Sequence, residues 1–456
     1  MLELMISAPA SGSGKTVLTC ALLAALKRRG LNPCAFKCGP DYIDPMFHRS
    51  VLGVDSHNLD LFLSDENTVR GLYRQYAASH GSVVAEGAMG FYDGLGGSTD
   101  RASAWHAADT LDLPVLLAVR PKGASLTLAA QIKGLQAFRT PSHIVGLFLN
   151  DCSPMLAKSL KPMLERETGL PVLGYLPHME EAVLESRHLG LQTAGEIENL
   201  TARIDCAART LDDTMDWDAL FALCDRRDGW ELRPNPPARE RVPIAVARDE
   251  AFCFLYEETL DALRQAGANL LFFSPLHHEK PPENACGLYL PGGYPELYAA
   301  QLAENESMRR SIQNAVSRGL PTVAECGGFL YLGKSLQGAD GQVWPMVGCL
   351  PGDGVRTSRL VRFGYSRLTA DDDSLLFRAG ESVPVHEFHY WDSTENGNSL
   401  TASKPLTGRS WPCGFTGERL YAAFPHRYFP GRPALAERFV QAAERYRKEG
   451  LDHVKA

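Results

Sequence analysis

The amino-acid sequence predicts an α/β protein of two domains, each built on its own sheet. The chain has 456 residues, more than one hydrophobic core usually organises. Short apolar runs in the first half are separated by segments long enough for crossover helices, which is typical of a mainly parallel sheet. A second series of such runs follows residues 233–240, a segment rich in proline and charge.

In the first half, apolar runs are expected to form strands, and residues 16–29 are expected to form a helix. Val17, Leu18, Ala21 and Leu22 share one face of that helix, and Gly30 supplies a stop signal. The apolar runs are residues 2–7, 34–37, 82–85, 114–119 and 144–149. The pattern loosens after residues 171–176. The start of the chain is therefore predicted to be a unit of strand, loop and helix.

The second half restarts the α/β pattern at residue 243. The expected elements are a strand at 243–247, a helix at 257–266 and apolar strands at 270–273, 287–290 and 321–324. We therefore place a first domain at residues 1–195, a connecting segment and linker at 196–240, and a second domain at 241–456.

Composition argues against several classes of function. The formal net charge of -8 disfavours broad attraction to nucleic acid. The longest apolar stretches are far shorter than the roughly 20 residues that cross a bilayer. Eleven cysteines without paired metal-ligand spacing are typical of reduced thiols. Because the N-terminus leads directly into a strand, we expect a cytoplasmic protein without a membrane span.

Residues 8–16 follow a predicted strand and open a predicted helix, the context of a nucleotide phosphate loop. Backbone N–H groups there can bind phosphate oxygens, Lys15 adds positive charge, and the Thr16 hydroxyl can bind magnesium. Pro9 stands where the usual pattern has its first glycine, so an ordinary glycine-rich turn remains the alternative. The nucleotide-binding residues predicted in the loop are Gly12, Ser13, Gly14, Lys15 and Thr16.

Acidic residues follow two of the predicted strands, where the ligand crevice of an open α/β sheet lies. Asp41 and Asp44 follow one strand, and Glu86 and Asp93 follow another. Carboxylates there can hold magnesium near the phosphates, although acids also cap helices or face water. Asn150 ends a further strand at the same edge and could contact an adenine base, or simply favour a turn.

In the second half, an apolar strand delivers Cys326 into two glycines. A sharp turn of this kind exposes a nucleophile and frees the following amide, that of Gly327, for an oxyanion. Gly293 lies in a diglycine after another strand and is a second candidate donor. His426 follows a short apolar strand and is a candidate base. A buried, unreactive thiol is the alternative for Cys326.

Taken together, these segments resemble the cobyrinate a,c-diamide synthase family nearly from end to end. Besides the phosphate loop, the similar segments are residues 37–45, 86–94, 249–254, 291–296, 325–328 and 386–390. The resemblance implies a dethiobiotin-synthetase-like ATPase joined to a class I glutamine amidotransferase domain. By position, it makes Cys326 the glutaminase nucleophile and His426 its base. It also implies metal contacts at Thr16, Asp41 and Glu86, substrate contacts at Tyr42 and Asp93, and a base contact at Asn150.

The resemblance further implies a reaction. ATP and Mg²⁺ would activate a carboxylate of a cobyrinate-like macrocycle as an acyl phosphate, glutamine would supply ammonia through an enclosed route, and two rounds would give the a,c-diamide. The partners are then small molecules, and a homodimer is left open. Hydrogenobyrinate or nickel-sirohydrochlorin could replace cobyrinate, or the chain could be a regulatory P-loop protein. Tyr428 stands where many class I glutaminases have glutamate, so a third triad member is absent or elsewhere.

Overall fold

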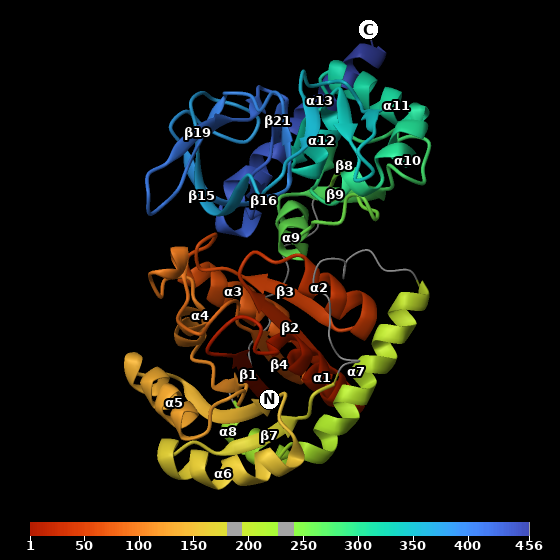
Figure 1. Ribbon diagram of the computed structural model, residues 1–456. Coiled ribbons are helices and arrows are strands. Elements are labelled where there is room, and N and C mark those ends of the chain that lie inside the picture. The colour runs from red at the N-terminus through yellow and green to blue at the C-terminus, as the bar shows by residue number, and fades with distance from the viewer. Residues whose placement is uncertain (180–193, 227–240, 456) are drawn as a thin grey trace. The chain divides into compact units, whose positions relative to one another are not determined.

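The computed structural model describes residues 1–179, 194–226 and 241–455. The chain divides into two compact units, Met1–Pro234 and Asn235–Ala456, which are each built on their own sheet (Figure 1). The mixed α/β fold class predicted from the sequence is confirmed. The proline-rich segment predicted as a linker, residues 233–240, lies outside the described residues.

The first unit is built on a parallel sheet. Within the described residues this sheet has seven strands in the order β3-β2-β4-β1-β5-β6-β7, and every neighbouring pair is parallel. The strands are β1 Leu2–Ser7, β2 Pro33–Cys38, β3 Asp55–Leu59, β4 Ser82–Glu86, β5 Val115–Val119, β6 Ile144–Asn150 and β7 Val172–Leu176. The phosphate loop therefore leaves a central strand, β1.

Helices cover both faces of this sheet because successive strand residues point to opposite sides. Leu4 and Ile6 of β1 pack into one core with α1 and α7, whereas Met5 packs into the other with α3 to α6. The helices are α1 Lys15–Arg28, α2 Ile43–Phe47, α3 Glu66–Ala77, α4 Ala104–Leu111, α5 Leu126–Phe138, α6 Pro154–Thr168, α7 Ala194–Thr214 and α8 Trp217–Cys224. The predicted unit of strand, loop and helix is confirmed.

Residues 196–240 were expected to be a connecting segment and linker, but helix α7, which covers part of this range, packs into the first unit. Its apolar residues Ile204, Ala208 and Leu211 are buried in the same core as α1, and α7 runs alongside α1 in Figure 1. Helix α8 adds Leu220 to this core. The described part of the segment therefore belongs to the first unit, because its apolar face covers the sheet.

Replacing Leu211 with alanine is expected to lower the free energy of unfolding of the first unit by about 2–5 kcal/mol. The Leu211 side chain is fully buried, so its loss leaves a cavity beside α1. Arg209→Ala is the matched control, because Arg209 lies on the exposed side of the same helix. Urea unfolding measures both variants, and equal stabilities would show that α7 does not contribute to the core.

The second unit is built on a mixed sheet with the order β20-β21-β11-β10-β8-β9 in the described residues. All neighbouring pairs are parallel except β20 with β21. The strands are β8 Val242–Ala247, β9 Ala268–Phe273, β10 Gly287–Leu290, β11 Thr322–Glu325, β20 Phe415–Thr416 and β21 Leu420–Ala423. The helices are α9 Glu257–Gln265, α10 Ala299–Glu304, α11 Glu306–Ser317, α12 Gly327–Leu332 and α13 Pro433–Lys455.

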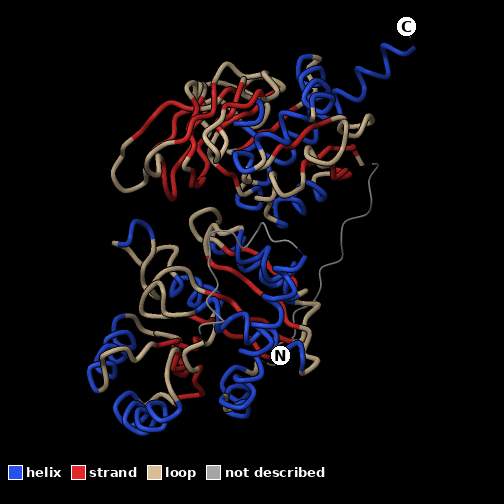
Figure 2. Tube along the Cα trace, turned by 45° about the vertical axis from the view of Figure 1, so that its right-hand side comes forward, coloured by secondary structure: helices blue, strands red, loops and turns tan. Residues whose placement is uncertain are grey.

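Two further sheets extend this unit (Figure 2). One has the order β13-β12-β14-β17, and the other has the antiparallel order β19-β18-β15-β16-β22. Their strands are β12 Ser335–Gln337, β13 Val343–Pro345, β14 Asp353–Arg356, β15 Arg362–Ala370, β16 Ser382–His389, β17 Trp391–Ser393, β18 Leu400–Ser403, β19 Ser410–Cys413 and β22 His426–Arg427. In the part of the chain that is described, no helix is both long and apolar enough to span a bilayer.

Candidate functional site

The phosphate loop joins the buried strand β1 to helix α1. Gly12 and Gly14 have φ angles of 75° and 84°, a left-handed conformation that favours glycine. Gly14 is the N-cap of α1, which begins at Lys15. The loop therefore presents backbone N–H groups and the positive end of a helix dipole, which together favour phosphate.

Asn150 packs against this loop. Its side-chain Nδ2 donates a hydrogen bond to the Ser13 carbonyl at 3.0 Å. A Cβ atom added to Gly14 would lie 1.9 Å from the same nitrogen. Asn150, which the sequence suggested for contact with a base, thus also fixes the shape of the loop.

Gly14→Ala is expected to weaken ATP binding by at least about tenfold, because strain of 1–3 kcal/mol at a left-handed position is compounded by the clash with Asn150. Gly12→Ala is the matched control. It has a similar φ angle, but a Cβ there meets nothing within 4 Å. Titration calorimetry with a non-hydrolysable ATP analogue measures both affinities; an equal loss in the two variants would assign the effect to φ alone.

Behind the loop, Glu86 lies at the centre of a buried charge cluster. Its Oε1 atom accepts hydrogen bonds from the Thr16 hydroxyl at 2.8 Å and from Lys37 Nζ at 2.7 Å. Lys37 also contacts Asp44 Oδ2 at 2.5 Å. Lys15 Nζ donates to the carbonyl oxygens of Ala10 and Met89. The carboxyl ends of β2 and β4 thus meet the loop, as the sequence predicted.

Lys37 was not among the predicted site residues, although it lies in the same segment as Asp41. Burial alone would lower the pKa of Lys37, but Asp44 and Glu86 raise it well above its usual value, so the side chain stays charged. Burial lowers the pKa of Lys15. Burial and the neighbouring Asp44 raise the pKa of Asp41 to about 6. An anionic ligand would therefore face two lysines that differ in pKa: that of Lys37 is raised, and that of Lys15 is lowered.

A cavity of about 530 Å³ opens over these groups. The predicted site residues that line it are Gly12, Gly14, Lys15, Thr16, Asp41, Glu86 and Asn150. Tyr42 is buried and is not part of the lining, and neither is Asp93, whose Oδ2 accepts the Gly90 N–H at 3.1 Å. The structure thus brings together the predicted metal residues and the predicted nucleotide residues other than Ser13, but not the two predicted substrate contacts.

Arg120, Asp151 and His178 also line the cavity, and none of them was predicted as a site residue. Arg120 Nε and His178 Nδ1 contact the Asp151 carboxylate at 2.5 and 2.7 Å. They follow β5, β6 and β7 at the sheet edge where the phosphate loop lies. Their signal in the sequence was their position after apolar strands, the same signal that singled out Asn150.

The donor atoms beside the loop suit a magnesium ion. Glu86 Oε2 is buried, and among the described residues it has no hydrogen-bond partner, so one carboxylate oxygen is available next to the Thr16 hydroxyl. Asp41 lines the same cavity. Hard oxygen donors of this kind, completed by water and phosphate oxygens, are what Mg²⁺ binds.

In the second unit, Cys326 lies on a sharp turn between β11 and α12. Its φ and ψ angles are 47° and -103°, a strained combination for a residue other than glycine. Its N–H donates to the Ala423 carbonyl of β21 at 3.0 Å, which anchors the turn to the sheet. This is the geometry of a nucleophile elbow, as the sequence predicted.

Gly292 brings Cys326 and His426 together. A Cβ atom added to Gly292 would lie 2.4 Å from His426 Cε1 and 3.4 Å from Cys326 Cβ, so both side chains flank this glycine. The His426 ring stacks on His386 with centroids 4.9 Å apart, and the Tyr256 hydroxyl lies 2.7 Å from His386 Nε2. The segment 386–390 includes the end of β16.

The two predicted oxyanion donors also lie close together. A Cβ on Gly327 would lie 3.0 Å from the Gly293 nitrogen. The Gly327 amide hydrogen-bonds toward the Cys326 side chain. The Gly293 nitrogen thus lies beside Gly327, whose amide faces the thiol, where a tetrahedral oxyanion would form.

Burial sets the protonation states of Cys326 and His426. It raises the pKa of Cys326 well above its usual value, and Glu296 adds to this effect. Burial lowers the pKa of His426 to about 4. At neutral pH the resting pair is therefore a thiol and a neutral imidazole, so the imidazole can accept the thiol proton as the sulfur attacks.

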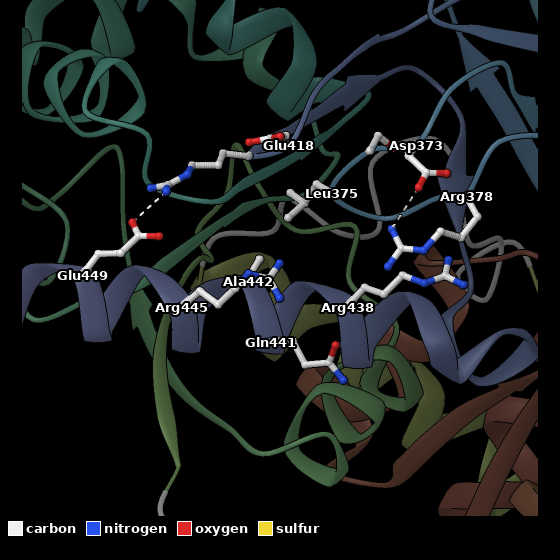
Figure 3. Close-up of a pocket in the computed structure, with 11 residues that line it drawn as sticks. Asp373, Leu375, Arg378, Glu418, Arg438, Gln441, Ala442, Arg445 and Glu449 are labelled. Atoms are coloured by element: carbon white, nitrogen blue, oxygen red, sulfur yellow. Dashed lines mark hydrogen bonds and ion pairs between the residues drawn. The ribbon is translucent and has the colours of Figure 1, made fainter.

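A further cavity of about 410 Å³ in the second unit is lined by charged residues. Figure 3 shows Arg438, Arg445 and Glu449 along α13, and Arg378 on a neighbouring segment. Several of these charges are already paired. Glu449 contacts Arg419 at 2.7 Å, Arg378 contacts Asp373, and Arg438 contacts Glu381. The cavity is a network of surface ion pairs rather than a reactive site.

Two family models match the chain. The model described as "CobQ/CobB/MinD/ParA nucleotide binding domain" matches residues 4–191, and the model described as "CobB/CobQ-like glutamine amidotransferase domain" matches residues 243–431. The first range contains the phosphate loop and the Glu86 cluster. The second contains Cys326 and His426.

Curated relatives named cobyrinate a,c-diamide synthase match almost the whole chain. The protein from Synechococcus sp. is 38% identical over 455 residues, covering 97% of this chain and 98% of the relative. The protein from Caldanaerobacter subterraneus is 38% identical, covering 92% of this chain and 94% of the relative. The protein from Salmonella typhimurium is 38% identical, with 97% and 98% covered.

Proposed function

Because the chain belongs to the cobyrinate a,c-diamide synthase family of glutamine-dependent amidating ligases, we propose that it converts the a and c carboxylates of cobyrinate into carboxamides. ATP activates each carboxylate, and glutamine supplies the nitrogen. The observation that supports this most is the presence of two chemically complementary sites in one chain. One is a phosphate loop with buried lysines and acids, and the other is a cysteine elbow with a histidine.

In the first unit, a substrate carboxylate oxygen attacks the γ-phosphorus of ATP, the bond to the bridging oxygen breaks, and ADP leaves. Lys15 and the loop amides hold the phosphates and stabilise the charge that develops on them. Lys37, kept charged by Asp44 and Glu86, is available to the incoming carboxylate. Magnesium held by Thr16, Asp41 and Glu86 would offset phosphate charge. The product is an acyl phosphate with a good leaving group.

In the second unit, Cys326 attacks the side-chain amide of glutamine while His426 takes the thiol proton. The Gly293 and Gly327 amides stabilise the oxyanion. His426 then returns the proton to the leaving nitrogen, and ammonia departs from a thioester that water hydrolyses to glutamate. Ammonia attacks the acyl phosphate, and phosphate leaves as the carboxamide forms. Tyr42 and Asp93 are proposed substrate contacts.

Mass spectrometry of macrocycles incubated with the protein, ATP, magnesium and glutamine tests this function. We expect cobyrinate to lose about one mass unit at each of two carboxylates, because OH is replaced by NH₂. Hydrogenobyrinate and nickel-sirohydrochlorin are tested in parallel. Conversion of one of these in place of cobyrinate would reassign the substrate but keep the chemistry. Glutamine binding without hydrolysis, and no amidation of any macrocycle, would favour a regulatory protein.

A further inference from the structure

The residues next to the proposed nucleophile and base form a buried ion pair. Glu325 directly precedes Cys326, and Arg427 directly follows His426. Glu325 Oε1 accepts hydrogen bonds from Arg427 Nε at 2.8 Å and from the Arg427 backbone N–H at 3.0 Å. Both side chains are only 1% exposed. The two members of this ion pair are thus the immediate chain neighbours of the proposed nucleophile and the proposed base.

This ion pair connects two different sheets. Glu325 ends β11 of the mixed sheet, whereas Arg427 lies on β22, which pairs with β16 of the antiparallel sheet. The Tyr289 hydroxyl donates to Glu325 Oε2 at 2.8 Å, so both carboxylate oxygens are held. The Arg427 guanidinium stacks 3.6 Å from the centre of the Tyr421 ring. These contacts fix the end of β11 and the position of β22 relative to each other.

A stability role alone does not explain such a pair. Removing two charges from water costs several kcal/mol each, and a buried ion pair is often no more stabilising than an apolar pair of the same size. Position 428, two residues after the histidine, is tyrosine, so the glutaminase lacks an acid at the position where many glutaminases carry one. Although burial dominates the pKa of His426, Glu325 is the main charge that opposes this lowering, against His389 and Arg427.

We propose that Glu325, held by Arg427 and Tyr289, is a positioning residue that aligns His426 with Cys326 and balances the charge of the imidazolium formed during glutamine hydrolysis. It replaces the carboxylate that many glutaminases carry two residues after the histidine. The proposal rests on the roles given above to Cys326 and His426. It predicts that the ion pair acts on turnover rather than on glutamine binding.

The double variant Glu325→Met with Arg427→Met tests this proposal without leaving an uncompensated buried charge. We expect kcat for glutamine hydrolysis to fall about 100-fold or more, with KM changed less than about threefold. Amidation with added ammonia should stay at the wild-type rate. The matched control is Glu449→Met with Arg419→Met, an ion pair of the same unit that is 50% and 39% exposed. It should keep kcat within about twofold.

A folded double variant, with a wild-type thermal unfolding curve and a kcat within threefold of wild type, overturns the inference. If the double variant does not fold, Glu325→Asp is the deciding test. Aspartate keeps the negative charge, but its side chain is shorter by one methylene. We then expect about tenfold lower kcat at unchanged KM; an unchanged kcat overturns the proposal. Retained glutamine hydrolysis in Cys326→Ala would instead move the nucleophile to another residue, and no amidation of any macrocycle by the wild-type protein would refute the proposed function itself.

Discussion

Cys326→Ala is expected to abolish glutamine-dependent amidation while amidation with added ammonia continues. The thiol is the proposed attacking group, and alanine offers no nucleophile in its place. Loss of a nucleophile lowers turnover by at least about a thousandfold in enzymes of this kind. The first unit, with its separate phosphate loop, does not depend on this thiol and should still form the acyl phosphate.

The measurement follows carboxamide formation with either nitrogen donor, and glutamate release from glutamine. Cys349→Ala is the matched control, because Cys349 is a partly buried thiol of the same unit that lies outside the elbow. It should keep both activities. Loss of both activities in Cys326→Ala would contradict an independent glutaminase role, and retention of both would move the nucleophile to another residue.

Glu86→Gln is expected to give the opposite result, with amidation lost for both nitrogen donors and glutamine hydrolysis retained. Glutamine has nearly the same shape as glutamate, but it removes the negative charge that holds Lys37 and the carboxylate oxygen next to Thr16. Loss of one preorganised electrostatic contact commonly costs about 100- to 1,000-fold in turnover. We expect an effect of that size on ADP release with cobyrinate present.

Glu66→Gln serves as the control for this variant. Glu66 is an exposed acid of the same unit, paired with Arg70 within α3, and its replacement should leave ADP release unchanged. Magnesium dependence adds a second readout, because a weakened metal site should need a higher magnesium concentration for half-maximal rate. A wild-type rate and magnesium dependence in Glu86→Gln would remove Glu86 from the proposed metal site.

The sequence by itself determined the local parts of this protein. The buried strands of the first sheet are continuous apolar runs because helices cover both of their faces, and such runs can be recognised without knowing their neighbours. The phosphate loop and the Cys326 turn were predictable for a related reason. Each depends on glycines and on the strand before it, which lie within a few residues of one another.

Strand β3 and helix α7 show where local patterns fail. Strand β3, Asp55–Leu59, has the polar sequence DSHNL and lies at the edge of the sheet. It has no apolar run from which a strand could be predicted. Helix α7 was expected to lie in a connecting segment. Its assignment to the first unit depends on contact with α1, which is far away in the sequence.

The tertiary structure alone decided how the reactive groups meet. Lys37 and Glu86 are 49 residues apart, and Glu325 and Arg427 are 102 residues apart. Parallel strands of the first sheet end at one edge, and this brings Lys37 against Glu86. Cys326 follows β11 of the mixed sheet, His426 lies on β22 of the antiparallel sheet, and both side chains flank Gly292. A sequence pattern records which side chain ends a strand, but the side chain across from it is set by strand order and packing.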